Sequence, residues 1–205
     1  EVRKFGSGSG TVTSSPAGIN CGSDCSEIYP DGTGIQLTAI ADASSVFTGW
    51  GSFCRGPSAS CAITVSRGNQ LVEATFALKS VVGNAPNLDI DGDGKYLAAT
   101  DGLLISRFAS ADGLDFPPAA AVAAPAVGGT ATRITSTQIF TYLNDVYPML
   151  DVDRDGFLST TDSMLIVRYL LGFRGAALVG GLTLPAGMTA AIIEANIAAM
   201  MPVLP

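Results

Sequence analysis

Apolar and polar residues alternate along the first 79 residues of the chain, which is the period of strands with one buried face. The alternation is clearest at residues 35–40 and 71–76, and Pro/Gly/Asp/Asn clusters at residues 30–34 and 67–69 interrupt it. Residues 1–79 are therefore predicted to form a small all-β domain. Its strands are expected at residues 1–4, 11–13, 35–40, 46–50, 62–65 and 71–76.

After a linker at residues 80–87, the apolar residues follow a helical period and the pattern occurs twice, in residues 88–148 and 150–202. Each copy reads as an acidic loop, a helix (101–108 or 162–171), a Gly/Pro/Ala-rich connection and a second helix. The second helices are expected to begin at Thr135 and Thr189, and Thr135 with Gln138 predicts a capping box. Their apolar stripes coincide at Ile139, Leu143 and Val146 in one copy and Ile193, Ile197 and Met200 in the other. Residues 88–205 are therefore predicted to form an all-α domain.

The loop of the second copy has the residue spacing of a calcium-binding loop. Asp151, Asp153, Asp155 and Asp162 take positions 1, 3, 5 and 12, and Gly156 takes position 6. Alternate Asp side chains on a tight loop direct carboxylate oxygens to one centre, and Gly at position 6 permits a left-handed backbone. The predicted ligands are Asp151, Asp153, Asp155 and Asp162, with Phe157 at position 7 contributing its backbone carbonyl. Asp- and Gly-rich turns also occur without metal, but here the spacing recurs.

The loop of the first copy repeats the acidic positions with one extra residue before the closing acid. The predicted ligands are Asp89, Asp91, Asp93, Lys95 (through its backbone carbonyl) and Asp101, with Gly94 at position 6. Asp101 stands at position 13, and position 9 is Leu97, whose side chain cannot bind a cation. Either the loop bulges to bring Asp101 in, or Thr100 and water complete the shell. Calcium is expected in both loops; the second matches the calcium-loop spacing at every acidic position, whereas the first departs from it by the extra residue.

The charge of the chain is concentrated in these loops. The 205 residues have a net charge of −7, and eight of the 18 acidic residues are loop aspartates, so the remainder carries +1 (−7 + 8). Basic residues do not cluster, and nucleic acid is not an expected partner. No apolar run reaches the ~18 residues of a membrane-spanning helix, so no transmembrane segment is expected.

The cysteines lie in the predicted β domain, at positions 21, 25, 54 and 61. Four cysteines allow three disulfide connectivities. Their local pairing and the absence of His favour Cys21–Cys25 and Cys54–Cys61, with a four-cysteine zinc site as the competing interpretation. Disulfides and weak extracellular calcium sites both indicate a compartment outside the cytoplasm.

The β domain resembles a divergent internalin-type B-repeat of secreted bacterial proteins. The resemblance rests on GSGTVTSSPAG at residues 8–18, FTGW at 47–50 and ATF at 74–76, and it covers nearly the whole domain. It implies a small β-grasp-like fold that serves as a surface spacer or interaction module without catalysis.

The segment DVDRDGFLSTTDSMLIVRYLLG, residues 151–172, resembles a dockerin repeat, a calcium loop with an exit helix but no entering helix. The resemblance implies secretion, calcium-dependent folding and binding of a cohesin-like partner. Its partner-reading positions correspond to Thr160 and Thr161, and to Ala98 and Ala99 in the first loop. This chain departs from a dockerin in the extra residue of its first loop and in its longer repeat.

Together these features predict an α+β multidomain chain, in which a disulfide-stapled β domain precedes an all-α, dockerin-like domain with two EF-hand-type calcium loops. The expected function is that of an extracellular, non-enzymatic structural or interaction module of a bacterial surface protein. Self-assembly into a filament or surface layer is an alternative, suggested by the apolar segments 117–127 and 198–205. A second alternative is an ancillary fragment of a carbohydrate-active enzyme; the absence of His and of acids outside turns and ligand loops argues against catalysis.

Overall fold

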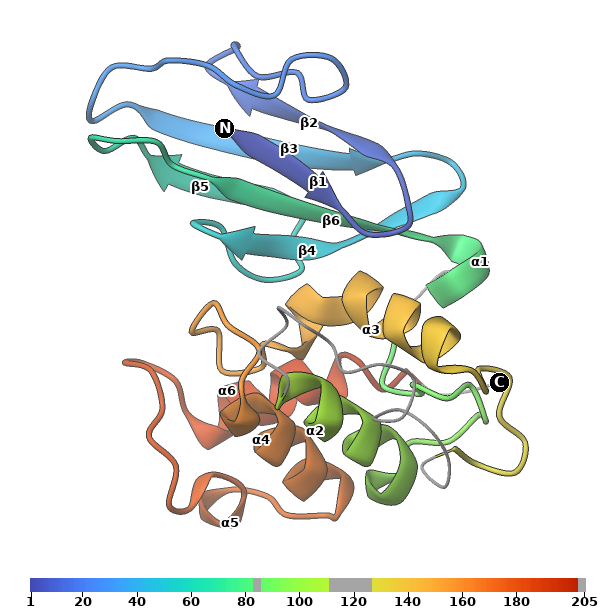
Figure 1. Ribbon diagram of the computed structural model, residues 1–205. Coiled ribbons are helices and arrows are strands. Elements are labelled where there is room, and N and C mark those ends of the chain that lie inside the picture. The colour runs from blue at the N-terminus through green and yellow to red at the C-terminus, as the bar shows by residue number, and fades with distance from the viewer. Residues whose placement is uncertain (83–85, 111–126, 203–205) are drawn as a thin grey trace. The chain divides into compact units, whose positions relative to one another are not determined.

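The computed structural model describes residues 1–82, 86–110 and 127–202 (Figure 1). The chain divides into two compact units, Glu1–Ala85 and Pro86–Pro205. The first is built of strands, and the described part of the second holds helices without a strand. The chain is therefore of mixed α and β class, as the sequence predicts.

The first unit contains two small sheets. One has the order β1-β6-β4, in which β1 and β6 run parallel and β4 antiparallel to β6, and the other has the antiparallel order β2-β3-β5. The strands are β1 (Val2–Phe5), β2 (Gly10–Ser15), β3 (Gly34–Ala41), β4 (Ser45–Ser52), β5 (Ser60–Thr64) and β6 (Val72–Leu78). They lie where the alternating pattern predicts them.

The arrangement of these strands differs from the expected β-grasp. A β-grasp packs a helix against a single sheet, whereas here two sheets enclose the core and the described helix of this unit is the single turn α1 (Lys79–Val82). The first and last strands do lie side by side in parallel, with Val2 opposite Val72. The pattern of one strand does not determine its partner strand, so the resemblance alone could not specify two sheets.

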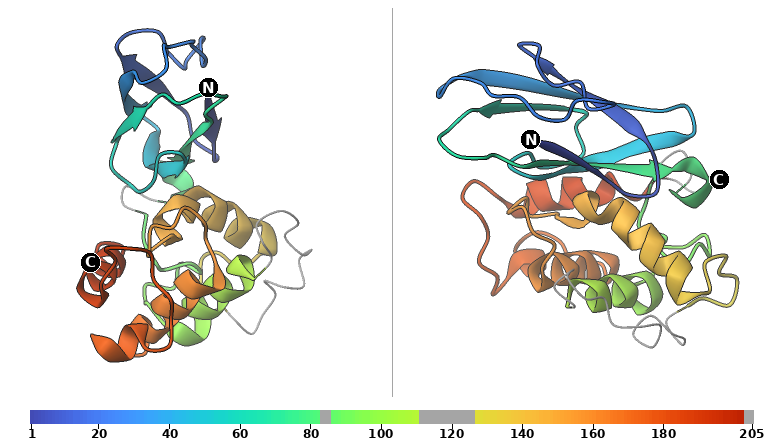
Figure 2. Two further views of the ribbon diagram at one scale, coloured as in Figure 1. Left: turned by 90° about the vertical axis from the view of Figure 1, so that its left-hand side faces the viewer. Right: turned by 45° about the horizontal axis from the view of Figure 1, so that its top comes forward.

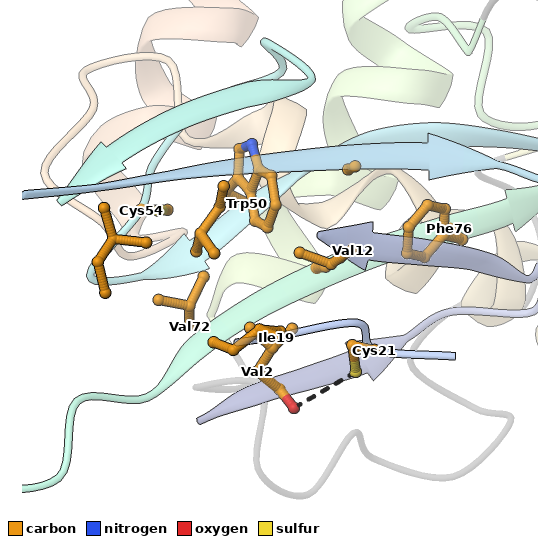
Figure 3. Packing of buried hydrophobic residues seen from close by; sticks show 12 residues of the cluster. Val2, Val12, Ile19, Cys21, Trp50, Cys54, Val72 and Phe76 are labelled. Carbon is orange, nitrogen blue, oxygen red and sulfur yellow. Dashed lines mark hydrogen bonds between the residues drawn. The ribbon is translucent and has the colours of Figure 1, made fainter. Parts of the chain in front are cut away.

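The core of the first unit draws on both sheets (Figure 3). Trp50 is 2% exposed, and its indole N–H donates to the carbonyl of Ser58 at 2.7 Å. The Phe47 ring contacts both Trp50 and Phe76 edge to face. Below about 80 residues such a core is small, which is why covalent staples are valuable here.

Two disulfides, Cys21–Cys25 and Cys54–Cys61, staple this unit. The pairing is the local one that the spacing favours. No cysteine is left as a thiol, and the competing zinc site is therefore ruled out. In a chain-entropy account, closing loops this short stabilises the fold by about 2 kcal/mol each.

The second unit is built from helices that follow the predicted repeat (Figure 1). They are the π-helical turn η1 (Ala98–Gly102), α2 (Leu103–Ala109), α3 (Ser136–Leu150), α4 (Thr160–Leu170), α5 (Ala176–Val179) and α6 (Ala190–Ala198). The predicted capping box at Thr135 is confirmed, and Thr189 caps α6 through its side chain alone. The short helix α5 lies in the second Gly/Pro-rich connection, where no helix is expected. None of the helices in the described ranges is long and apolar enough to cross a membrane.

The exit helices α2 and α4 pack directly against each other, as the views in Figures 1 and 2 agree. Their close approach occurs at Gly102, where an added Cβ would lie 2.9 Å from a methyl group of Val167. The helices therefore hold the two acidic loops, which immediately precede them, in one compact unit.

Candidate metal centre

The two acidic loops fold in the same way at their first positions. The carboxylate of Asp151 accepts the amides of Asp155 and Gly156 at 3.1 and 3.0 Å. Asp89 accepts the amides of Asp93 and Gly94 at 3.0 Å each. The glycine at position 6 is left-handed in both loops, with φ 98° at Gly156 and 81° at Gly94. The predicted role of these glycines in the backbone turn is therefore confirmed.

The closing acid of the second loop, Asp162, is fully buried at the start of α4. One of its oxygens accepts the amides of Val152 and Asp153 at 2.9 and 3.2 Å, and the other accepts the amide of Ser159 at 2.9 Å. The carboxylate thus ties the beginning of the loop to its end.

Asp101 closes the first loop with the same hydrogen bonds, despite standing one residue later. It accepts the amide of Ile90 at 2.6 Å, that of Asp91 at 3.4 Å and that of Leu97 at 2.8 Å. The extra residue is taken up by η1, because a π-helical turn holds one residue more than an α-turn. Of the two arrangements that the sequence leaves open, the structure contains the bulge that brings Asp101 in.

The structure brings together part of each predicted ligand set. In each loop three carboxylates place an oxygen within 4.8 Å of those of the other two. These groups are Asp89, Asp91 and Asp101 in the first loop and Asp151, Asp153 and Asp155 in the second. Asp93 and Asp162 lie outside these groups. An oxygen of Asp93 accepts the amide of Lys95. The oxygens of Asp162 accept the amides of Val152, Asp153 and Ser159.

The position-7 residues occupy equivalent places. The amide of Lys95 donates to Asp93 at 2.9 Å, and that of Phe157 donates to Asp155 at 2.8 Å. Both side chains are exposed, Phe157 to 67%. Their backbone carbonyls are thus the groups of these residues that a loop-bound cation could contact.

Burial makes these carboxylates unfavourable as bare anions. It raises the pKa of Asp101 and of Asp151 to about 6 and that of Asp162 to about 7. Burial also raises the pKa of Asp89 and Asp153. Hydrogen bonds from loop amides act in the opposite direction but are outweighed. An all-oxygen, mainly carboxylate donor set of this kind fits a hard divalent cation, whose charge would favour the ionised form.

Residues 128–133, here called the strap, cover the first loop. The Arg133 side chain donates from Nε to the carbonyl of Ile90 at 2.7 Å and from its terminal nitrogen to the carbonyl of Asp89. Its guanidinium also lies over the Tyr142 ring, 4.0 Å from the centroid. Further strap donors are the amide of Gly128 to Asp91 Oδ2, the amides of Thr132 and Arg133 to the carbonyl of Asp91, and the hydroxyls of Thr132 and Thr130 to the carbonyls of Gly92 and Asp93.

The strap is not predicted by any local pattern in the sequence. Its residues lie about 40 positions after the loop that they cover, inside a connection that shows no periodicity. The one sequence signal for the strap is Arg133, a single basic residue just before the helix cap Thr135 in a chain with few basic residues. The second loop has a smaller counterpart, since the side-chain Nδ2 of Asn196 in α6 donates to the carbonyl of Val152 at 2.9 Å.

Thr160 and Thr161, the predicted partner-reading residues, begin α4, where Thr160 is exposed and Thr161 half-buried. The counterparts in the first loop, Ala98 and Ala99, lie in η1.

The first unit is similar to a known protein family. The family model described as "Divergent InlB B-repeat domain" matches residues 2–80, which include both sheets and both disulfides. Residues 2–80 are thus similar to this family and are called the B-repeat domain below. Both acidic loops lie outside the matched range. Comparison with curated proteins gave no match, and comparison with solved structures gave none either.

Within the B-repeat domain, the residues that carry the resemblance have structural roles. Gly10 stands in β2 where an added Cβ would overlap the ring of Phe76. Trp50 and Phe76 are both buried in the core. The motif thus describes the packing of the B-repeat domain rather than a reactive site.

Proposed function

We propose that the chain is an extracellular, non-enzymatic module of a bacterial surface protein, in which calcium orders the dockerin-like C-terminal unit. The observation that carries the proposal is the matching closure of the loops by Asp101 and Asp162. In both loops, despite their different lengths, the closing carboxylate accepts the amides of loop positions 2, 3 and 9. The B-repeat domain and the disulfides support an extracellular location.

Calcium would relieve electrostatic repulsion between the loop carboxylates. Carboxylates about 5 Å apart repel by about 3 kcal/mol per pair at an effective dielectric near 20. A divalent ion among them turns this repulsion into attraction, and at 100 times its dissociation constant it stabilises the fold by about 2.7 kcal/mol per site.

Calorimetry of the full chain in calcium and in chelator tests the proposal. Calcium is expected to raise the melting temperature of the C-terminal unit. Hydrogen exchange at residues 86–110 and 127–202 reports on this unit separately. The B-repeat domain in the same molecule serves as the internal reference. Asp153→Asn is expected to weaken the response, whereas Asp31→Asn, in an exposed turn of the B-repeat domain, leaves it unchanged. Identical melting with and without calcium would contradict the proposal.

A second candidate function is docking or self-association through α4. Its surface exposes Met164 to 42%, and Leu171, which ends the helix, is exposed to 62%. Thr160, Met164, Arg168 and Leu171 follow the spacing of one helical face. A cohesin-like partner and a second copy of the chain are the two occupants that this face suggests. The apolar segment 117–127 lies almost wholly outside the described residues, as does the end of the apolar tail, residues 203–205.

Light scattering over a range of protein concentrations tests self-association. Met164→Ser with Leu171→Ser is expected to abolish any concentration-dependent increase in mass. Ile192→Ser, which removes a similarly exposed apolar side chain on α6, serves as the control. A chain that stays monomeric at all concentrations would remove the assembly alternative.

A further inference from the structure

One end of the B-repeat domain contains a cavity of about 330 Å³. It lies where β1, β3 and β6 begin and β5 ends, so both sheets contribute to its walls. The deep walls are aliphatic and almost completely buried: Val2 is 2% exposed, Leu37 1% and Val72 1%. Val2, Ile19 and Val72 lie side by side in Figure 3. The volume is at the lower end of the range of ligand-binding pockets.

Polar side chains surround the mouth of this cavity. They are Glu1, Glu27, Tyr29, Asn69 and Gln70. A packing defect inside a core would be closed and lined by apolar atoms, whereas this cavity joins an aliphatic interior to a hydrogen-bonding rim. That combination is typical of binding pockets.

Glu27 places a negative charge at the rim. Among the described residues that line the cavity, Glu1 and Glu27 are acidic and none is Lys or Arg. The Glu1 side chain is neutralised by Arg3, whose Nε donates to it at 2.9 Å. Glu27 accepts the amide of Ile28 at 2.7 Å through one oxygen, which leaves it acceptor capacity for a cation at the mouth.

Ile28 stands at the same mouth with 94% of its surface exposed. Its apolar surface would contribute to binding only if an occupant reached past the cavity and covered it. A small molecule that fills the cavity would leave Ile28 in water, whereas a polypeptide that continues over the rim would bury it.

We propose that this cavity is a docking site for a polypeptide partner, which inserts one aromatic or large aliphatic side chain and places an adjacent Lys or Arg against Glu27. The aliphatic walls bind the inserted side chain, the carboxylate selects the cation, and Ile28 packs against the continuing chain. The site belongs to the B-repeat domain and needs no metal ion, so it stands independently of the calcium proposal.

Methyl NMR spectra of the full chain, titrated with short blocked peptides, test this site. Acetyl-Gly-Phe-Lys-Gly-amide is expected to shift the methyl signals of Ile35, Leu37, Val65 and Val72. The matched peptide with Glu in place of Lys is expected to bind roughly three- to fivefold more weakly, because an exposed charge pair contributes modestly. The peptide with Ala in place of Phe is expected to lose at least about tenfold in affinity. Equal binding of all three peptides, or no shift at these methyls, would overturn the proposal.

Variants separate the contributions of the rim. Glu27→Gln is expected to remove the preference for Lys over Glu, whereas the control Asp31→Asn, on an exposed turn outside the cavity, keeps it. Ile28→Ser is expected to weaken the peptide but to leave phenethylamine, a probe with the same ring and charge but no continuing chain, unaffected. If phenethylamine binds as tightly as the peptide, the site takes a small molecule and the polypeptide assignment is wrong.

Discussion

Gly128 lies directly against the carboxylate of Asp93, so closely that a Cβ at position 128 would overlap Asp93 Oδ2. The same glycine donates its amide to Asp91 Oδ2 at 2.5 Å. The strap therefore reaches the acidic loop through a position where a side chain has no room. Because the backbone of Gly128 is not left-handed, the requirement for glycine is purely one of space.

Gly128→Ala is expected to destabilise the C-terminal unit by about 2 kcal/mol, the typical effect of forcing a methyl group into packed surroundings. The neighbouring Gly129→Ala is the matched control, since nothing lies within 4 Å of its added Cβ and its φ is ordinary. That control is expected to be neutral or to stabilise by about 0.5 kcal/mol. Urea unfolding of both variants measures the difference; equal stability would mean that the strap does not rest on the loop.

Arg133→Met is expected to destabilise the C-terminal unit by about 2 to 3 kcal/mol. The substitution removes two charged donors from the carbonyls of Asp89 and Ile90, together with the cation–π contact to Tyr142. Arg174→Met is the control, because Arg174 also stacks on a tyrosine, Tyr169, and donates to carbonyls, but from an exposed position. Its expected cost is below about 1 kcal/mol. Thermal unfolding in chelator compares the two variants, and a larger loss in the control would refute the role given to the strap.

Asp162→Ala and Asp155→Asn are expected to differ in their dependence on calcium. Asp162→Ala leaves the amides of Val152 and Ser159 without their acceptor, and should cost about 3 kcal/mol with or without the ion. Asp155→Asn keeps an acceptor for the amide of Phe157 and reduces the repulsion, so in chelator its effect is expected to be small. In calcium it is expected to be destabilising.

Denaturant midpoints of these two variants, measured in calcium and in chelator, give the required four values. The wild-type chain under both conditions is the reference. A loss for Asp155→Asn that is the same in both buffers would show that Asp155 acts in the fold alone.

The metal-free chain is expected to lose stability as pH rises from about 4 to about 7. The folded-state pKa values of Asp101 and Asp151, about 6, and of Asp162, about 7, lie above the ordinary value of 3.8. The folded state therefore binds more protons than the unfolded state in this range, and the slope of stability with pH is negative. Below the ordinary pKa the contribution is fully present, and above about pH 7 it is lost.

Calcium is expected to oppose this trend, because it binds the ionised carboxylates and its stabilising effect grows as they deprotonate. Melting temperatures between pH 4.5 and 8, in chelator and in calcium, measure both slopes. Metal-free stability that increases over this range would contradict the burial of these three acids.

Features that depend on near neighbours along the chain were readable from the sequence. The strands of the B-repeat domain, the caps at Thr135 and Thr189, the local disulfides and the left-handed glycines of the loops all follow from periodicity or short spacing. Each of these features is stabilised within a few residues, so the pattern that encodes it lies in one short stretch.

The pairing of distant segments was decided by the tertiary structure. Tyr96 and Leu158, which both stand at position 8 of their loops, do not form a β-bridge with each other. Instead, the amide of Leu158 donates to the Tyr147 hydroxyl at 3.4 Å, and the Tyr96 hydroxyl donates to the carbonyl of Pro202. The carbonyl to which a side chain donates therefore depends on where the packed helices place that side chain.

The number and spacing of the acidic residues were therefore determined by the sequence alone. The division of the strands into two sheets, the π-helical turn that brings Asp101 into register and the strap that covers the first loop required the tertiary structure. The physical reason is that these arrangements are stabilised by contacts between segments some 40 or more residues apart, or by packing of whole elements, and no local pattern of residues records such contacts.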